Sequence, residues 1–117
     1  MPQYLLLLYA DPTGWRSMPH ADAEQWMGNY LAWNDKARQA GFYAGSNRLS
    51  DEPGRVIRSR SGQAHVTDGP YSEAKEVLGG YNLIEASSYD EAVQRLLDHP
   101  HLSHGGTIEV REAEPVR

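Results

Sequence analysis

The feature that most constrains the fold is an unbroken apolar segment near the start of the chain. Residues Gln3 to Ala10 carry four consecutive leucines between two tyrosines, without alternation of polar and apolar side chains. A strand covered on one face alternates, whereas a continuous apolar run is typical of a strand buried on both faces. The run is far shorter than the about 20 residues of a membrane span. We therefore predict a buried strand with both faces covered.

A long amphipathic helix is predicted next, after a turn at residues 11–14. Gly41 is well placed to end this helix, and Phe42 to Leu49 then has the composition of a second strand. The side chains that recur at helical spacing, and that we expect to face the core, are Ala23, Trp26, Met27, Tyr30, Trp33, Ala37 and Ala40.

Two short segments then flank Gly62 and alternate polar with apolar residues. Val56 to Ser61 and Gln63 to Thr67 predict a half-exposed hairpin near a sheet edge. Ser72 to Val77 is long enough for about one helical turn. Gly79 and Gly80 are expected to release the chain into a buried strand at residues 81–86.

The last third of the chain predicts a second helix and a final strand. Ser88 and Glu91 have the spacing of a capping box, and the helix must end before Pro100. Residues 107–110 supply the last strand. The apolar stripe of the helix consists of Ala92, Val93, Leu96 and Leu97.

This order of elements predicts an α+β, ferredoxin-like βαβ-β-βαβ domain with a β-hairpin insert. In that fold two helices cover one face of an antiparallel sheet, and the other face stays bare. The run from Leu5 to Leu8 and the pair Leu83-Ile84 place apolar groups on both faces. Because a bare apolar face is unusual in a monomer, we predict a homodimer that pairs through the sheet face.

Length and composition limit the remaining possibilities. We expect the 117 residues to form one domain at residues 1–112, followed by a frayed tail at 113–117. Sixteen acidic against eleven basic residues give a net charge of −5, which disfavours direct binding to nucleic acid or to anionic membranes. Without cysteine the chain has no disulfide or thiolate metal site, as is usual for cytoplasmic proteins. No cofactor motif is evident: Gly79-Gly80 lacks the lysine of a phosphate loop.

A segment in the second half of the chain resembles a known family signature. The sequence Val66-Thr67-Asp68-Gly69-Pro70-Tyr71-Ser72-Glu73-Ala74-Lys75-Glu76-Val77-Leu78-Gly79-Gly80-Tyr81 resembles that of the YCII-related (DGPF) family. The ending His99-Pro100-His101-Leu102, followed by residues 105–111, is similar to the same family. Tyr71 replaces the usual phenylalanine and Ala74 the usual threonine.

The resemblance implies a dimeric α+β barrel with a cleft near the ends of the strands, in a group whose members mostly have no assigned function. Some relatives are linked to sigma factors of the extracytoplasmic-function type. In smaller YCII proteins a histidine on the first helix and an aspartate near the end of the second helix are a proposed active-site pair. The first helix here has no histidine after His20, so that pair is not reproduced.

His101 is the main catalytic or ligand candidate, because it lies in the matched His-Pro-His-Leu segment where the cleft of such a fold would open. Asp11, at the end of the first strand, would place a carboxylate in the same cleft. A turn-forming role before Pro12 is the alternative for Asp11. Helix-capping is the alternative for the histidines.

Five further residues are ligand-binding candidates: Trp15, Asp68, Tyr71, Lys75 and His99. Trp15 is expected as a pocket wall, and Tyr71 with Lys75 would hold a polar or anionic ligand if their turn faces the cleft. Asp68 is equally suited to stabilising the turn at Gly69-Pro70. A weaker alternative is a metal site formed by His99, His101 and His104.

Two functions remain open from the sequence. The first is a small-molecule site, with or without catalysis, in a dimeric barrel. The second is a non-catalytic accessory or regulatory module that binds a protein partner, such as a component of an extracytoplasmic-function sigma factor system.

Overall fold

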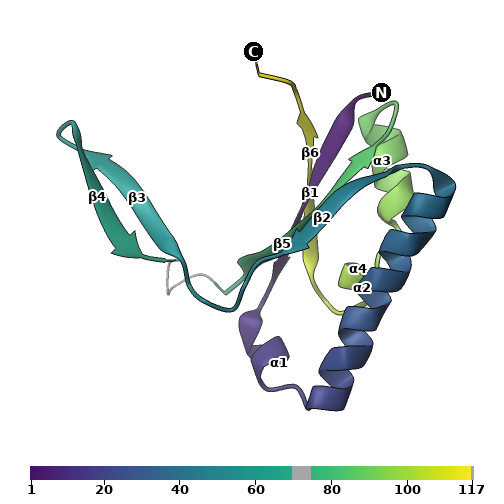
Figure 1. The fold of residues 1–117 in the computed structure, drawn as a ribbon, viewed down its shortest axis with the longest axis horizontal. Coiled ribbons are helices and arrows are strands. Elements are labelled where there is room, and N and C mark those ends of the chain that lie inside the picture. The colour runs from purple at the N-terminus through teal and green to yellow at the C-terminus, as the bar shows by residue number, and fades with distance from the viewer. Residues whose placement is uncertain (70–74, 117) are drawn as a thin grey trace.

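The main body of the protein is a four-stranded antiparallel sheet with helices on one face (Figure 1). The computed structural model describes residues 1–69 and 75–116. The strands are ordered β2-β5-β1-β6, and every neighbouring pair is antiparallel. Their bounds are β1 Gln3–Ala10, β2 Tyr43–Arg48, β5 Val77–Glu85 and β6 Thr107–Ala113. The α+β class and the antiparallel sheet are therefore as predicted.

Two longer helices cover this sheet, and two short helices lie in the connections. Their bounds are α1 Pro12–Arg16, α2 His20–Ala40, α3 Tyr89–Leu96 and α4 Pro100–Ser103. Gly41 ends α2 in the left-handed conformation, with φ of 85°, which glycine adopts without steric cost. Ser88 caps α3 by accepting a hydrogen bond from the Glu91 N–H at 3.1 Å.

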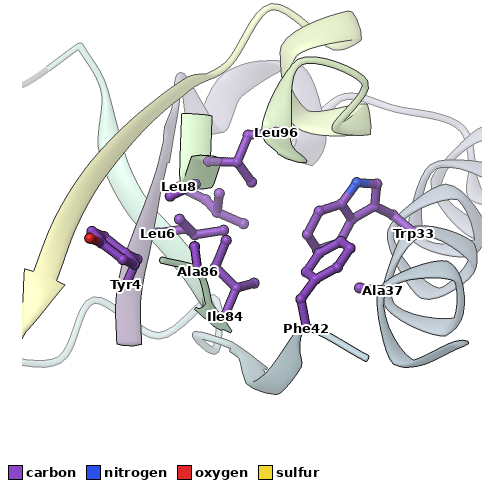
Figure 2. Close-up of a cluster of buried hydrophobic side chains, with 10 residues drawn as sticks. Tyr4, Leu6, Leu8, Trp33, Ala37, Phe42, Ile84, Ala86 and Leu96 are labelled. Carbon is purple, nitrogen blue, oxygen red and sulfur yellow. The ribbon is translucent and has the colours of Figure 1, made fainter. Parts of the chain in front are cut away.

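The hydrophobic core lies between the sheet and the two helices. Figure 2 shows Leu6, Leu8 and Ile84 pointing from the strands toward the rings of Trp33 and Phe42. The two rings meet edge to face, with centroids 5.8 Å apart. Leu6 and Ile84 are fully buried. Burial of one such side chain contributes about 1.5–3 kcal/mol, so this layer is the main source of stability.

The second face of β1 differs from the first. Leu5 and Leu7 point to this face and are half-buried, as is Leu83, which is the register partner of Leu5 on β5. Among the described residues, no helix lies over this face (Figure 1). One chain therefore covers only one of the two faces of the apolar run.

The hairpin is not at the edge of the main sheet, where we predicted it. β3 (Arg55–Arg60) and β4 (Gln63–Asp68) form a separate two-stranded sheet that projects from the body (Figure 1). Ser61 and Gly62 both have positive φ, 50° and 79°, as a tight hairpin turn between right-twisted strands requires. The polar, alternating sequence predicted the hairpin but not its separation from the sheet.

Two predicted turns are ordered elements instead. Residues 12–16 form α1, because Asp11 caps its N-terminus and Pro12 suits the first helical position. Gly79 and Gly80 lie inside β5. A Cβ at Gly80 would lie 2.9 Å from the Asn47 carbonyl oxygen, so the glycine is needed for close approach of β2. The predicted helical turn at 72–77 falls largely outside the described residues, and Val77 begins β5.

The predicted apolar stripes are buried only in part. On α2 the buried residues are Trp33, Asn34 and Ala37. On α3, Val93 and Leu97 are exposed by 41% and 62%. β6 reaches Ala113, one residue beyond the predicted domain boundary. Within the described part of the chain, no helix has the length and apolar character needed to cross a membrane.

Candidate functional site

The segment His99-Pro100-His101 places two imidazoles inside the protein. His99 is the N-cap of α4, and its Nδ1 accepts a hydrogen bond from the His101 backbone N–H at 3.0 Å. Pro100 has no N–H to satisfy and fits the first position of this short helix. The two side chains are only 2% and 6% exposed. The local sequence thus explains why both histidines turn inward.

Hydrogen bonds fix the protonation of both rings. The Nε2 atom of His101 lies 2.7 Å from the Tyr9 carbonyl oxygen, which can only accept, so this nitrogen donates. The Tyr30 hydroxyl lies 2.7 Å from Nδ1 of His101 and donates to it. His99 Nδ1 already accepts, so its Nε2 donates to Asn82 Oδ1 at 3.0 Å. Both imidazoles are therefore neutral, with the proton on Nε2.

The bonds continue across the layer between α2 and the sheet. Asn82 Nδ2 donates to Asn34 Oδ1 at 3.2 Å, and Asn34 Nδ2 donates to Ser46 Oγ at 3.1 Å. The indole N–H of Trp26 donates to the Tyr30 hydroxyl at 3.1 Å. We call this set the histidine network; its members are Trp26, Tyr30, Asn34, Ser46, Asn82, His99 and His101. Because buried polar groups are costly when unpaired, these mutual bonds link α2, α4, β2 and β5 in one arrangement.

Burial controls the titration of these groups. Desolvation, with His101 as the next cause, lowers the pKa of His99 from 6.5 to about 4. Burial also lowers the pKa of His101, although the Tyr9 carbonyl and the Glu76 carboxylate oppose this shift. Burial raises the pKa of Tyr30. The network is consequently uncharged near neutral pH.

Gly106 is the residue that makes room for His101. A Cβ at this position would lie 2.2 Å from His101 Nε2 and 2.5 Å from two ring carbons. The neighbouring Gly105 is required for a different reason, since its φ of 82° lies in the left-handed region. The pair Gly105-Gly106 therefore allows β6 to begin directly against the imidazole.

A series of packed aromatic rings extends from the histidine network toward α1. The Trp26 ring stacks on His104 at 4.1 Å between centroids, and Trp15 meets Trp26 edge to face at 5.9 Å. Nε2 of His104 is buried and has no hydrogen-bond partner among the residues that the structure describes. Trp15, predicted as a pocket wall, therefore stands at the outer end of a series of packed rings that leads inward to Tyr30.

Asp11 does not join His101. Its carboxylate caps α1 and accepts hydrogen bonds from the N–H and hydroxyl of Thr13, at 2.9 and 2.7 Å. These bonds, together with the charge of Lys75, lower the pKa of Asp11. Among the described residues no hydrogen bond or ion pair connects Asp11 to His101. The carboxylate whose charge acts on His101 is that of Glu76.

Two cations lie near α1, one over the Trp15 ring and one near Asp11. The guanidinium carbon of Arg48 lies 5.1 Å from the centre of the Trp15 ring, and Lys75 is close enough to act on Asp11. Arg48 also forms an ion pair with Asp51 at 2.7 Å. We call Trp15, Arg48 and Lys75 the cationic rim. A flat ring and two positive charges, whose present partners are Asp51 and Asp11, make this group a candidate for holding an anion.

The other predicted ligand residues are dispersed. Asp68 is exposed on the projecting hairpin, where it pairs with Arg55 at 3.6 Å. Tyr71 lies outside the described residues. His99 is enclosed in the network and has both ring nitrogens bonded. The structure thus brings together Trp15, Lys75 and Asp11 and separates them from Asp68.

A metal site at the three histidines has little geometric basis. All four ring nitrogens of His99 and His101 take part in hydrogen bonds, which would have to break before the side chains converged on an ion. In residues 1–69 and 75–116, no group of three or more histidine, aspartate or glutamate side chains is arranged to hold a metal.

Asp98, next to His99 in sequence, faces a different surface. It accepts a hydrogen bond from Trp33 Nε1 at 3.3 Å and pairs with Lys36, whose bond lowers the pKa of the carboxyl. A shallow groove of about 360 Å³ lies beside it, between α2 and α3. The charges along this groove are already paired within the chain, since Arg95 bonds to Glu91 at 3.1 Å.

Sequence reasoning found the histidines but missed the residues that hold them. Asn34 is a polar residue between Trp33 and Ala37 on the core side of α2, and Asn82 interrupts the apolar strand β5. A polar residue at a core position usually has a specific partner, so these two asparagines were the available signal. Gly106 had no comparable signal.

Comparisons with known proteins identify a family and a relative. The sequence model of the YCII-related domain matches residues 2–117. An uncharacterized protein of Rhizobium meliloti is 31% identical over 110 residues, which cover 92% of this chain and 89% of that protein.

Proposed function

The chain belongs to the YCII-related domain family, and from this premise we propose that it is a homodimeric, ferredoxin-like α+β barrel that binds a small anionic molecule at the cationic rim. The single observation that carries the proposal is the Arg48 guanidinium over the Trp15 ring, with Lys75 nearby, in a chain of net charge −5. Cations that lie together in a chain of negative overall charge favour a local anion site.

The fold part of the proposal is supported by the strand order and by the uncovered sheet face. The order β2-β5-β1-β6, with the helices on one side, is the order expected of the split βαβ arrangement. Leu5, Leu7 and Leu83 lie together on the other side. Arg111 and Glu109 of the edge strand β6 lie beside Leu5 and Leu7 and pair with each other, and Glu85 lies at the end of β5. A second copy pairing face to face would remove these leucines from water.

The histidine network has a supporting role in this proposal. A general base needs a free lone pair, and Nδ1 of His101 already accepts from Tyr30. We therefore place the ligand outside the network. We assign His101 a structural role, which is to hold the end of β1 at Tyr9, because α1 and Trp15 follow directly from that end. A reaction at His101 would first require its bond to Tyr30 to open.

Native mass spectrometry of the gently purified protein is the first test. It reports subunit number and any retained molecule together, and we expect a dimer. The affinity for inorganic phosphate and for benzoate is then measured by calorimetry, at constant ionic strength. We expect Arg48→Gln to weaken binding at least about tenfold, because a charge-assisted contact contributes about 1.5–3 kcal/mol.

Arg38→Gln is the matched control. Arg38 also stacks on an aromatic ring, that of Tyr43 at 4.3 Å, and also pairs with a carboxylate, Asp35 at 2.7 Å. It lies at the opposite end of α2 and should leave anion affinity unchanged within about twofold. Equal losses in both variants would contradict a site at the rim. A bare dimer without anion affinity would favour the accessory module that binds a protein partner.

A further inference from the structure

The hairpin β3–β4, residues 55–68, is an arm that stands away from the body. Its strands pair only with each other, and it projects on the side of the sheet opposite to α2 and α3 (Figure 1). The radius of gyration is 16.1 Å, whereas a compact chain of this length has about 13 Å. The arm is therefore the element that makes the single chain extended.

The arm has one apolar and one cationic face. Ile57 and Val66 are register partners, so their side chains share one face, and they are 69% and 62% exposed. Of the adjoining pairs on that face, Ser59 and Ala64 are small, and Arg55 and Asp68 at the base pair with each other at 3.6 Å. The opposite face carries Val56, Arg58, Arg60, Gln63, His65 and Thr67. An isolated chain thus leaves two branched apolar side chains in water on an element that has a distinct apolar face.

The arm is ordered at its base and unsupported along its length. The Gly69 N–H donates to the Gly54 carbonyl at 3.3 Å, and Val56 packs so closely that a Cβ on Gly69 would lie 2.5 Å from it. Beyond this base, two strands of six residues each extend over about 20 Å. A two-stranded hairpin alone is at best marginally stable in water, so a surface that covers its apolar face would stabilise it.

The charge of the arm indicates what covers it. Three arginines against one aspartate give the arm a net charge of +2, so the remainder of this chain of net charge −5 carries −7. A second copy of the chain presents a body of the complementary sign. The position of the arm is also suitable, because the arm projects beyond the bare sheet face on which the proposed dimer forms.

We propose that the arm docks through Ile57 and Val66 on a second copy of this chain, so that the two subunits of the dimer exchange arms. This inference rests on the proposed dimer. Each arm covers the body of the other subunit, and both apolar faces become buried at once. The arms add to the contact between the two sheet faces and set the mutual position of the subunits.

The test compares two variants that add the same side chain to opposite faces of the arm. Val66→Glu places a carboxylate on the apolar face, and Thr67→Glu places one at the next position, on the cationic face. The dimer dissociation constant is measured by sedimentation velocity for both variants and for the unmodified protein. We expect Val66→Glu to raise it at least about tenfold, and Thr67→Glu to change it by less than about threefold.

A second measurement needs no substitution. Hydrogen–deuterium exchange of peptides from residues 55–68 is followed in the unmodified protein above and below the dissociation concentration, and we expect slower exchange in the dimer. If both variants dimerise like the unmodified protein and hydrogen exchange of the arm does not depend on concentration, the docked arm is overturned. The proposed dimer is then not contradicted. A monomer at all concentrations overturns both.

Discussion

Gly106→Ala is the substitution that tests the histidine network most directly. The added methyl group would lie 2.2 Å from His101 Nε2, far inside van der Waals contact. Gly106 does not have positive φ, so the backbone itself accepts alanine. The imidazole must therefore move by more than 1 Å, roughly the difference from an ordinary contact of about 3.5 Å. The bonds from His101 to Tyr9 and Tyr30, both 2.7 Å, cannot survive such a movement.

The cost follows from these two bonds. Each hydrogen bond contributes about 1 kcal/mol net, and a buried donor or acceptor left unpaired costs about 1–3 kcal/mol. We expect a loss of about 2–4 kcal/mol in the free energy of unfolding. With an unfolding entropy of about 2.1 cal/mol/K per residue, a chain of this length loses about 4 °C in Tm per kcal/mol. The expected decrease is thus about 8–16 °C.

Thermal unfolding followed by circular dichroism, at one fixed protein concentration, measures this decrease. Gly28→Ala is the control: Gly28 lies within α2, a Cβ there meets nothing within 4 Å, and alanine should stabilise the helix by about 0.5–1 kcal/mol. In a double-mutant cycle, Gly106→Ala should cost little once His101→Ala has removed the ring. A Tm for Gly106→Ala within about 2 °C of the unmodified protein would refute the reasoning.

Two further predictions concern the same network. The pKa of His99 is about 4 in the folded chain and 6.5 in the absence of structure, so the unfolded chain binds more protons below pH 6.5 and stability falls as pH falls. We expect urea unfolding to show a loss of about 2 kcal/mol between pH 7 and pH 5. His99→Asn should lose the part of this pH dependence that His99 contributes, while the lowered pKa of His101 keeps a smaller slope; an unchanged pH slope would argue against a buried neutral His99. Tyr30→Phe leaves His101 Nδ1 and the Trp26 N–H unpaired and should cost about 1–3 kcal/mol in urea unfolding. Tyr81→Phe, which removes an exposed hydroxyl bonded to Asn47, should cost less than about 0.5 kcal/mol; equal costs would show that Tyr30 has no special role.

Much of the candidate site could not be predicted from the sequence because its partners are distant along the chain. The bond between Tyr30 and His101 joins residues 71 positions apart, and that between Asn82 and His99 joins residues 17 apart. The short-range roles were within reach: the capping by Asp11 and His99 depends on neighbours two residues away. The sequence therefore predicted the cap at Ser88 and a local role for Asp11 before Pro12, but not the short helices that Asp11 and His99 cap, nor which side chains meet in the interior.

The sequence by itself determined the strands, the two longer helices, their order and the antiparallel α+β class, because period, caps and glycines act over a few residues, but it did not predict the short helices α1 and α4. The Leu5 to Leu8 run also indicated that apolar side chains lie on both faces of β1. Only the tertiary structure decided that the hairpin stands apart as an arm, that Asp11 and His101 do not meet, and that Gly106 lies against an imidazole. These outcomes depend on how α2 and the strands pack, and packing is set by contacts between residues that no local pattern relates.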